Sequence, residues 1–447
     1  MRRTATPLPE PAGPIPPTYT SEVGSRLSVI DEMFLWTHRG LGLPIVMQGL
    51  WRTDGVVDVD ALEQLCDRIA SGPLGRRVRR PRLPGARPEF IVDTSRYPLS
   101  FRTEPVRIEQ VIEWADAQAL ITLDPERGPG WCVAATLDSD GGTVVSVTCS
   151  HVLADARGLI NALHDAMNRT SSAPADSAPV SDRADAVATT TRVLRGLTRA
   201  VFGLIVSPAR RAELHGLSAS PASARGLDRH RMSSAVVEVD AAQWDEAAST
   251  AGGTPNSLFL ACVGHLARRE NETGTVILSV PMNVRIAKGP DVTMTSVDNA
   301  VAMVAVPLTP LTTLAEIRRL CREAFTSPPM SSPAGFPAEL LQVVPDRLAH
   351  RLADGPGQRD ALCSNIGTVD ISAFDGHPTS GLALRAVHPG ATPAQLNSTS
   401  TRISGYLCRI GTTYTLSLVS FEAVDGSALR EQALQSLATF GITARVW

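Results

Sequence analysis

Two segments of the chain place a histidine four residues before an aspartate, a spacing that suits proton transfer. His151 precedes Asp155, and His350 precedes Asp354. A neutral imidazole takes a proton from a hydroxyl or an amine near pH 7, so either histidine is a candidate general base. With 9 histidines in 447 residues, this spacing also arises by chance. The surrounding sequence has to decide between the two.

The context of the second pair predicts a structural role. His350 ends an amphipathic stretch, and Gly355-Pro356-Gly357 follows Asp354 directly. This pattern is typical of a helix C-terminus, where a cationic residue in the last turn is favourable. We therefore expect His350 to belong to a helix end and to take no part in chemistry.

The context of the first pair allows a catalytic role. His151 follows the apolar residues 143–149, which predict a buried strand, and a helical pattern begins near Ala156. A strand end holds a side chain rigidly while leaving its tip free to face a cleft. Asp155 at the helix start would cap that helix and pair with a buried cation. The alternative is a core histidine beside an ordinary N-capping aspartate, and the local sequence leaves both open.

The elements around this loop predict a mixed fold. Residues 131–137 and 143–149 alternate as strands, and the acidic, glycine-containing residues 138–142 between them favour a hairpin. A strong helix is expected at 256–269 and a buried strand at 275–280. Helices and strands occur together in both halves of the chain, so the fold class is α+β with two lobes.

The lobes are expected at residues 23–170 and 232–447, after a flexible proline-rich tail at 1–22. Residues 171–231 form the predicted linker, which contains a basic amphipathic helix at 192–206. We expect that helix to bridge the lobes, with peripheral membrane contact as the alternative. The longest apolar runs fall short of the ~18 residues that a membrane span requires.

Composition excludes several classes of function. The net charge of −3 argues against a nucleic-acid partner, and the nucleotide-binding, zinc-protease and G-x-S-x-G signatures do not occur. The 7 cysteines are scattered without a C-x-x-C pair, which predicts no metal, no disulfide framework and a reducing, cytoplasmic location.

The segment from Ser150 to Gly158 resembles the H-H-x-x-x-D-G signature of the chloramphenicol-acetyltransferase-like superfamily. That superfamily includes peptide-synthetase condensation domains, polyketide-associated acyltransferases and wax ester synthase/diacylglycerol acyltransferases. Segments that agree in order and spacing with the wax ester synthase group are 27–35, 254–261, 281–285, 298–299 and 364–367. The chain departs from the pattern at Ser150, in place of the first histidine, at Ala156, in place of the glycine, and at Ser257, in place of an aspartate.

The resemblance implies two lobes of this superfamily's fold around a central tunnel, with His151 as the general base at its middle. It implies that Asp155 is mainly architectural and pairs with Arg285. Candidate oxyanion or substrate contacts are Gly158, Asn256, Ser364 and Asn365. No permanently bound cofactor is implied; the co-substrate is a thioester, either acyl-CoA or a phosphopantetheinyl carrier protein.

The function that follows is acyl transfer from this thioester to a hydroxyl or an amine of a small-molecule acceptor, in natural-product or lipid tailoring. One alternative is a stand-alone condensation-type enzyme that joins carrier-bound substrates through an amide or ester. The other is a repurposed or non-catalytic member, which the changes at Ser150 and Ala156 keep open.

Overall fold

The computed structural model describes residues 26–168, 181–206, 232–268, 274–285, 297–326, 336–353, 359–422 and 424–447. The predicted tail, most of the linker on either side of its helix, and Asp354 lie outside these ranges. No helix in the described ranges is long and apolar enough to cross a membrane.

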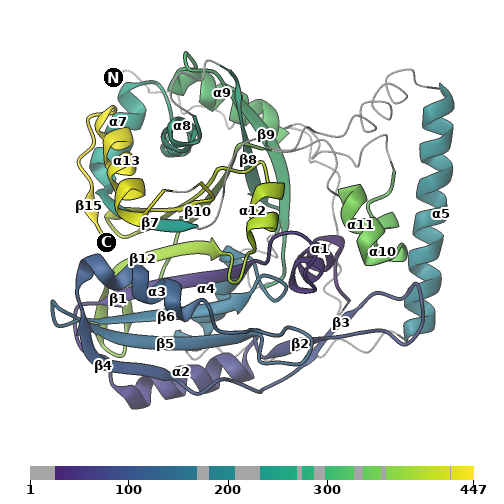
Figure 1. Ribbon diagram of the computed structural model, residues 1–447, viewed down its shortest axis with the longest axis horizontal. Helices are drawn as coiled ribbons and strands as arrows, with labels where there is room; N and C mark the ends of the chain where they lie inside the picture. Colours follow the sequence, from purple (N-terminus) through teal and green to yellow (C-terminus); the bar gives the residue numbers. More distant parts are fainter. Residues whose placement is uncertain are drawn as a thin grey trace, which may run out of the picture.

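The first lobe is built on a six-stranded sheet, in the lower half of Figure 1. Its strands in spatial order are β11 (Ala373–Phe374), β12 (His377–Val387), β1 (Val46–Thr53), β6 (Thr143–Ser150), β5 (Trp131–Asp138) and β4 (Ser100–Val106). Its helices are α1 (Val29–His38), α2 (Val59–Ser71), α3 (Val111–Gln118) and α4 (Ala156–Asn168), with a short 3-10 turn at Ile108–Gln110. A separate ribbon pairs β2 (Arg76–Arg79) with β3 (Glu89–Val92).

The second lobe is built on a seven-stranded sheet, in the upper half of Figure 1. Its strands in spatial order are β15 (Arg445–Val446), β7 (Ser233–Asp240), β14 (Thr413–Ser420), β13 (Ile403–Ile410), β10 (Ala361–Thr368), β8 (Val276–Asn283) and β9 (Val301–Leu308). The packed helices are α7 (Ala241–Thr250), α8 (Pro255–Ala267), α9 (Leu314–Thr326) and α13 (Gly426–Ala438). Shorter helices are α10 (Leu340–Val343), α11 (Asp346–Ala353) and α12 (Pro393–Ser398). The expected α+β class is confirmed.

Local sequence explains the hairpin that leads to His151. The carboxylate of Asp138 accepts hydrogen bonds from the N–H groups of Asp140, at 3.0 Å, and Gly142, at 2.7 Å. Gly141 has φ +90°, a conformation that side chains disfavour. The turn residues thereby close the β5–β6 hairpin where the sequence predicted it.

The start of α8 is also fixed locally. The hydroxyl of Thr254 accepts the N–H of Ser257 at 3.2 Å, Ser257 Oγ binds back to the N–H of Thr254, and Pro255 occupies the first turn. This capping box satisfies two N–H groups that a helix N-terminus otherwise leaves without partners. Ser257, one of the departures from the family pattern, therefore has a structural task here.

The sheets do not divide at residue 232 as the expected lobes do. β12 comes from the C-terminal half, yet it pairs antiparallel with β1 in the first sheet, where the two strands lie side by side (Figure 1). Without β12, the eight-residue edge of β1 would leave backbone groups unpaired. The segment 373–387 thus belongs structurally to the first lobe, a correction to the predicted boundary.

The predicted linker helix is α5 (Asp182–Val206), which stands at the edge of the molecule beside α10 and α11 (Figure 1). It is tied to the first lobe by ion pairs of Asp182 with Arg26, at 2.8 Å, and Asp185 with Arg87, at 2.7 Å. Among residues 182–202, the buried ones are Asp185, Ala186, Thr189, Val193 and Ala200, and the large exposed apolar ones are Val187, Leu194, Val201 and Phe202. The helix packs on its own protein, as expected, and membrane contact stays a prediction.

Candidate active site

The loop His151–Asp155 joins β6 to α4, as the sequence predicted. The backbone N–H of His151 donates to Ile45 O at 3.4 Å, which extends the pairing of β6 with β1 by one residue. His151 as a residue is partly exposed. A rigid strand therefore positions the imidazole.

Two residues from other elements hold the imidazole ring. Phe34, on α1, stacks on it with 3.7 Å between ring centroids and an interplanar angle of 16°. Asn299, just before β9, places its Oδ1 3.0 Å from His151 Nδ1. The ring is thus clamped on one face and at one nitrogen.

The hydrogen bonds of Asn299 determine which nitrogen carries the proton. Its Nδ2 donates to the carboxylate of Asp31 at 2.8 Å and to the carbonyl oxygen of His151 at 2.8 Å. Because both of those partners only accept, the amide oxygen must face His151 Nδ1. Nδ1 therefore carries the proton, and Nε2 presents a lone pair, as a general base requires.

Asp31 anchors this network from α1. Its second oxygen accepts hydrogen bonds from Ser28 N at 2.8 Å and Ser28 Oγ at 2.7 Å, in the capping box that starts α1. Burial raises the pKa of Asp31, and the hydrogen bonds from Asn299 and Ser28 oppose that rise. The chain Asp31–Asn299–His151 links a helix start to the imidazole.

Burial also lowers the pKa of His151 below its ordinary value, while the charge of Asp155 and the bond to Asn299 act in the opposite direction. The imidazole is accordingly neutral at neutral pH. This is the protonation state in which it can accept a proton.

Asp155 makes the buried pair that the resemblance implied. Its Oδ1 lies 2.6 Å from Arg285 Nη2, and the two side chains are 7% and 3% exposed. The same oxygen accepts the N–H of Gly158 at 2.7 Å, and Oδ2 accepts the N–H of Ala300 at 3.1 Å. Asp155 thus ties the loop to the second lobe, and both of its carboxylate oxygens accept hydrogen bonds from the protein. This geometry suits a residue that positions the loop of His151.

Gly158 does not offer its own N–H to an oxyanion, because that group donates to Asp155. A Cβ at this position would collide with the carbonyl oxygen of Val297. The glycine is therefore needed for the close approach of α4 to residue 297. An oxyanion donor in a backbone N–H beside Gly158 stays a prediction.

Asn256 and Asn365 form a second polar cluster in the other lobe. Asn365 Nδ2 donates to Asn256 Oδ1 at 2.9 Å, and Asn365 Oδ1 accepts the N–H of Gly367 at 3.0 Å. Ser364 precedes this pair on β10. Arg157, at the start of α4, donates to the carbonyl oxygens of Ile366 and Thr368 and so joins β10 to the histidine loop. Their contact with substrate stays a prediction.

His350 lies elsewhere, on α11. A Cβ placed on Gly42 would be 3.1 Å from His350 Cε1, so the imidazole packs against the segment that follows α1. This agrees with a structural role for the second motif, whose Asp354 is outside the described residues.

The cysteines offer no activated nucleophile. All 7 are buried, and burial raises the pKa of the Cys132, Cys262 and Cys408 thiols to about 12. Buried thiols of this kind are inert. Within the described ranges, no group of three or more His, Cys, Asp or Glu side chains is arranged to hold a metal ion.

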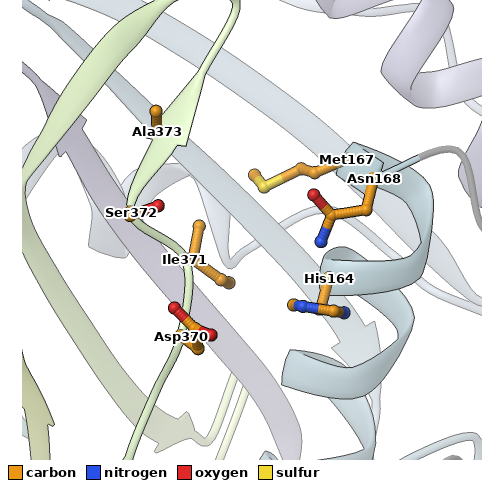
Figure 2. A pocket seen from close by; sticks show the side chains of 7 residues that line it. All are labelled: His164, Met167, Asn168, Asp370, Ile371, Ser372 and Ala373. Atoms are coloured by element: carbon orange, nitrogen blue, oxygen red, sulfur yellow. The ribbon is translucent and has the colours of Figure 1, made fainter.

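A small polar cavity of about 130 Å³ lies at the far end of α4 from His151. Figure 2 shows His164, Met167 and Asn168 projecting from α4 toward the segment 370–373 that lines its other side. The cavity is separated from the Asp155 end of α4 by about three helical turns. It is not part of the histidine site.

Sequence reasoning did not single out Asp31, Phe34 or Asn299. All three lie in segments that agreed with the family pattern, so the resemblance marked their surroundings without assigning their contacts. What identifies them is the clamp on the ring of His151.

Solved structures with the same architecture give the class of the fold. The first condensation domain of the CDA synthetase superposes with a TM-score of 0.58 at 16% identity, covering 93% of this chain and 97% of that chain. The wax ester synthase/diacylglycerol acyltransferase from Marinobacter aquaeolei VT8 gives 0.54 at 15% identity, covering 93% and 98%. The starter condensation domain of rhizomide synthetase, a mutant in complex with C8-CoA, gives 0.56 at 13% identity, covering 93% and 94%. No family model and no curated protein matches the sequence.

The chain therefore shares the two-lobed fold of these condensation-domain and wax ester synthase/diacylglycerol acyltransferase structures, which is the fold that the resemblance implied. The same fold occurs in structures described as an epimerization domain, with a TM-score of 0.54, and as an X-domain, with a TM-score of 0.51. The reaction of this chain has to be argued from its own site.

Proposed function

We propose that the protein is an acyltransferase that moves an acyl group from a thioester to a hydroxyl or an amine of a small-molecule acceptor. The observation that carries this proposal is the imidazole of His151, whose Nδ1 is held by Asn299 and whose Nε2 makes no hydrogen bond to the part of the chain that the structure describes. Geometry and protonation state both suit a general base.

In the proposed step, Nε2 takes the proton of the acceptor O–H or N–H as that atom attacks the thioester carbonyl. The tetrahedral intermediate then expels the sulfur, and the protonated His151 returns the proton to it. An ester or amide bond forms, the thioester C–S bond breaks, and a free thiol leaves. No covalent acyl-enzyme is needed, which agrees with seven buried cysteines.

The comparisons support the class of co-substrate. One structure of this fold was determined in complex with C8-CoA, and another is a wax ester synthase/diacylglycerol acyltransferase. Acyl-CoA and a phosphopantetheinyl carrier protein are thus the donors to test, and the second of them corresponds to a condensation-type enzyme.

The two departures from the family motif lie in the interior. Ser150 is 4% exposed, and its hydroxyl accepts the N–H of Val152 at 3.4 Å. Ala156 begins α4 and packs in the core of the first lobe. Both positions have structural tasks, so these changes do not argue against catalysis by His151.

The test is thiol release from octanoyl-CoA and from octanoyl-acyl carrier protein, each with a panel of alcohols and amines, with intact-mass detection of the product. We expect release that depends on the acceptor and is lost in His151→Ala. Thiol release from octanoyl-acyl carrier protein but not from octanoyl-CoA would identify the condensation-type enzyme. Absence of release with every pair, in a folded wild-type protein, would refute acyl transfer with this panel's chemistry and favour a non-catalytic member.

A further inference from the structure

A second histidine, His388, lies in the same row of the first sheet as His151. Val46, the first residue of β1, is paired with the last residue of β12 on one side and the last residue of β6 on the other. His388 and His151 are the next residues after those two strand ends. Ile45 lies between them and accepts the N–H of His151 at 3.4 Å.

The two imidazoles project from one face of the sheet. Two residues before each histidine stand Ala386 and Cys149, which belong to the same buried cluster. Because side chains alternate with a period of two, His388 and His151 share that face, and two strand spacings place their Cα atoms about 10 Å apart. A charge on His151 lowers the pKa of His388, as expected for groups this close.

The hydrogen bonds of His388 leave one nitrogen unused. Nδ1 lies 2.9 Å from the carbonyl oxygen of Pro44, which only accepts, so Nδ1 carries the proton. Nε2 is then an acceptor, and no donor among the described residues reaches it. The residue is 6% exposed, and its ring lies 5.0 Å from that of Phe421 of the second lobe.

The unused nitrogen is a buried lone pair. Burial lowers the pKa of His388 to about 4, so the ring stays neutral and accepting at neutral pH. Other buried side-chain atoms, among them Trp51 Nε1 and Thr189 Oγ1, also lack a partner among the described residues, so the missing partner does not by itself single out His388. The position of this one, in the row of His151 and facing the second lobe, favours a ligand at the proposed reaction site.

We infer that His388 Nε2 accepts a hydrogen bond from an O–H or N–H group of the substrate whose reacting atoms lie at His151. This inference rests on the proposed function and names a positioning residue for it. The donor group belongs either to the pantetheine amides of the thioester or to a second polar group of the acceptor. The chemistry is the same in both cases, so the experiment has to separate them.

The kinetic arm compares His388→Phe, which keeps a flat ring and loses the acceptor, with His388→Gln, which can present an amide oxygen. We expect kcat/KM to fall by about 10- to 100-fold in His388→Phe and to recover largely in His388→Gln. If His388→Phe lowers kcat/KM with octanoyl-CoA but not with S-ethyl octanethioate, the hydrogen-bond donor belongs to pantetheine. If it lowers kcat/KM with 1,2-hexanediol but not with 1-hexanol, the hydrogen-bond donor belongs to the acceptor.

The matched control is His265→Phe. His265 lies on α8, stacks on Phe440 with centroids 5.7 Å apart, and has a pKa lowered by burial, but it lies in the other lobe among helices. The thermal midpoints of the variants report folding, and turnover of the His265 variant should equal that of the wild type.

The second arm does not need turnover. In ¹⁵N-histidine-labelled protein, the Nε2 resonance missing from His388→Phe is assigned to His388, and it should move when octanoyl-CoA or 1,2-hexanediol is added. If the wild-type protein shows no turnover but its His388 Nε2 resonance moves when the ligand is added, acyl transfer is refuted and the binding role of His388 is retained. An unmoved resonance, or a folded His388→Phe with wild-type kcat/KM for all four probes, would overturn the inference.

Discussion

His151 and His388 end two strands on either side of β1, and each donates its Nδ1 proton to a fixed oxygen. For His151 that oxygen belongs to the side chain of Asn299, and the residue is partly exposed. For His388 it belongs to the backbone of Pro44, and the ring is buried. The same tautomer therefore occurs in two different environments.

The difference in environment separates their roles. Burial lowers the pKa of both histidines. The charge of Asp155 opposes this effect at His151, whereas at His388 the hydrogen bond to Pro44 opposes it and the charge of His151 adds to it, so that the pKa falls to about 4. A base must be able to hold a proton during the reaction, and a hydrogen-bond acceptor need not. His151 suits the first task and His388 the second.

The largest expected effect is at His151. His151→Ala should reduce kcat by roughly 10²–10⁴ because the acceptor loses its base, with little change in the thermal midpoint. Steady-state kinetics with the best donor and acceptor pair measure the effect.

The control for this prediction is the second motif. His350→Ala should leave kcat near the wild-type value, because His350 lies on α11 and packs against Gly42, away from His151. Equal losses at both histidines would contradict the choice of the first motif.

The loop of His151 is held by the ion pair of Asp155 with Arg285, so breaking this pair should affect His151 more than His388. Asp155→Ala and Arg285→Ala each strand a buried charge and should cost about 3–5 kcal/mol of stability. The double variant should be less harmful than the sum of the single ones, and Asp155→Asn should retain more fold than activity. Chemical unfolding of the four proteins measures the coupling; strictly additive losses would show that the pair is not coupled.

Asn299 tests whether the tautomer of His151 matters. Asn299→Leu removes the acceptor at Nδ1 and should lower kcat by about 10-fold. Asn299→Asp places a negative charge there, which should raise the pKa of His151 and move the acid limb of the pH–rate profile to higher pH. A purely structural role would lower both rates without moving that limb.

The smallest expected effect is a shift in the acid limb of the pH–rate profile of the wild-type enzyme. Because burial lowers the pKa of His151, the neutral base persists below the ordinary histidine pKa of about 6.5, and kcat/KM should fall only in more acidic solution. His388→Phe should leave the position of this limb nearly unchanged, since His388 protonates only near pH 4. A limb at or above pH 6.5 would contradict the burial argument.

Elements whose cause is local were predictable. The β5–β6 hairpin follows from Asp138 and its glycines, and the start of α8 from Thr254 and Pro255. The pairing of Asp155 with Arg285 followed from the family resemblance, since no local pattern relates residues 130 positions apart. Gly158 shows the opposite case, because the partner of its N–H became known only in three dimensions.

The sequence by itself determined the motif, the α+β class and the strand that ends at His151, because hydrophobic period and turn chemistry act between near neighbours. The tertiary structure decided that β12 joins the first sheet, that Asn299 sets the tautomer of His151, and that His388 lies on the other side of β1 from His151. A period of two shows that a segment is a strand and which residues share a face, but not which strand it pairs with. Strand pairing is determined by the burial and hydrogen bonding of the whole sheet. This pairing brings two imidazoles from distant parts of the chain to the same end of three neighbouring strands, β12, β1 and β6.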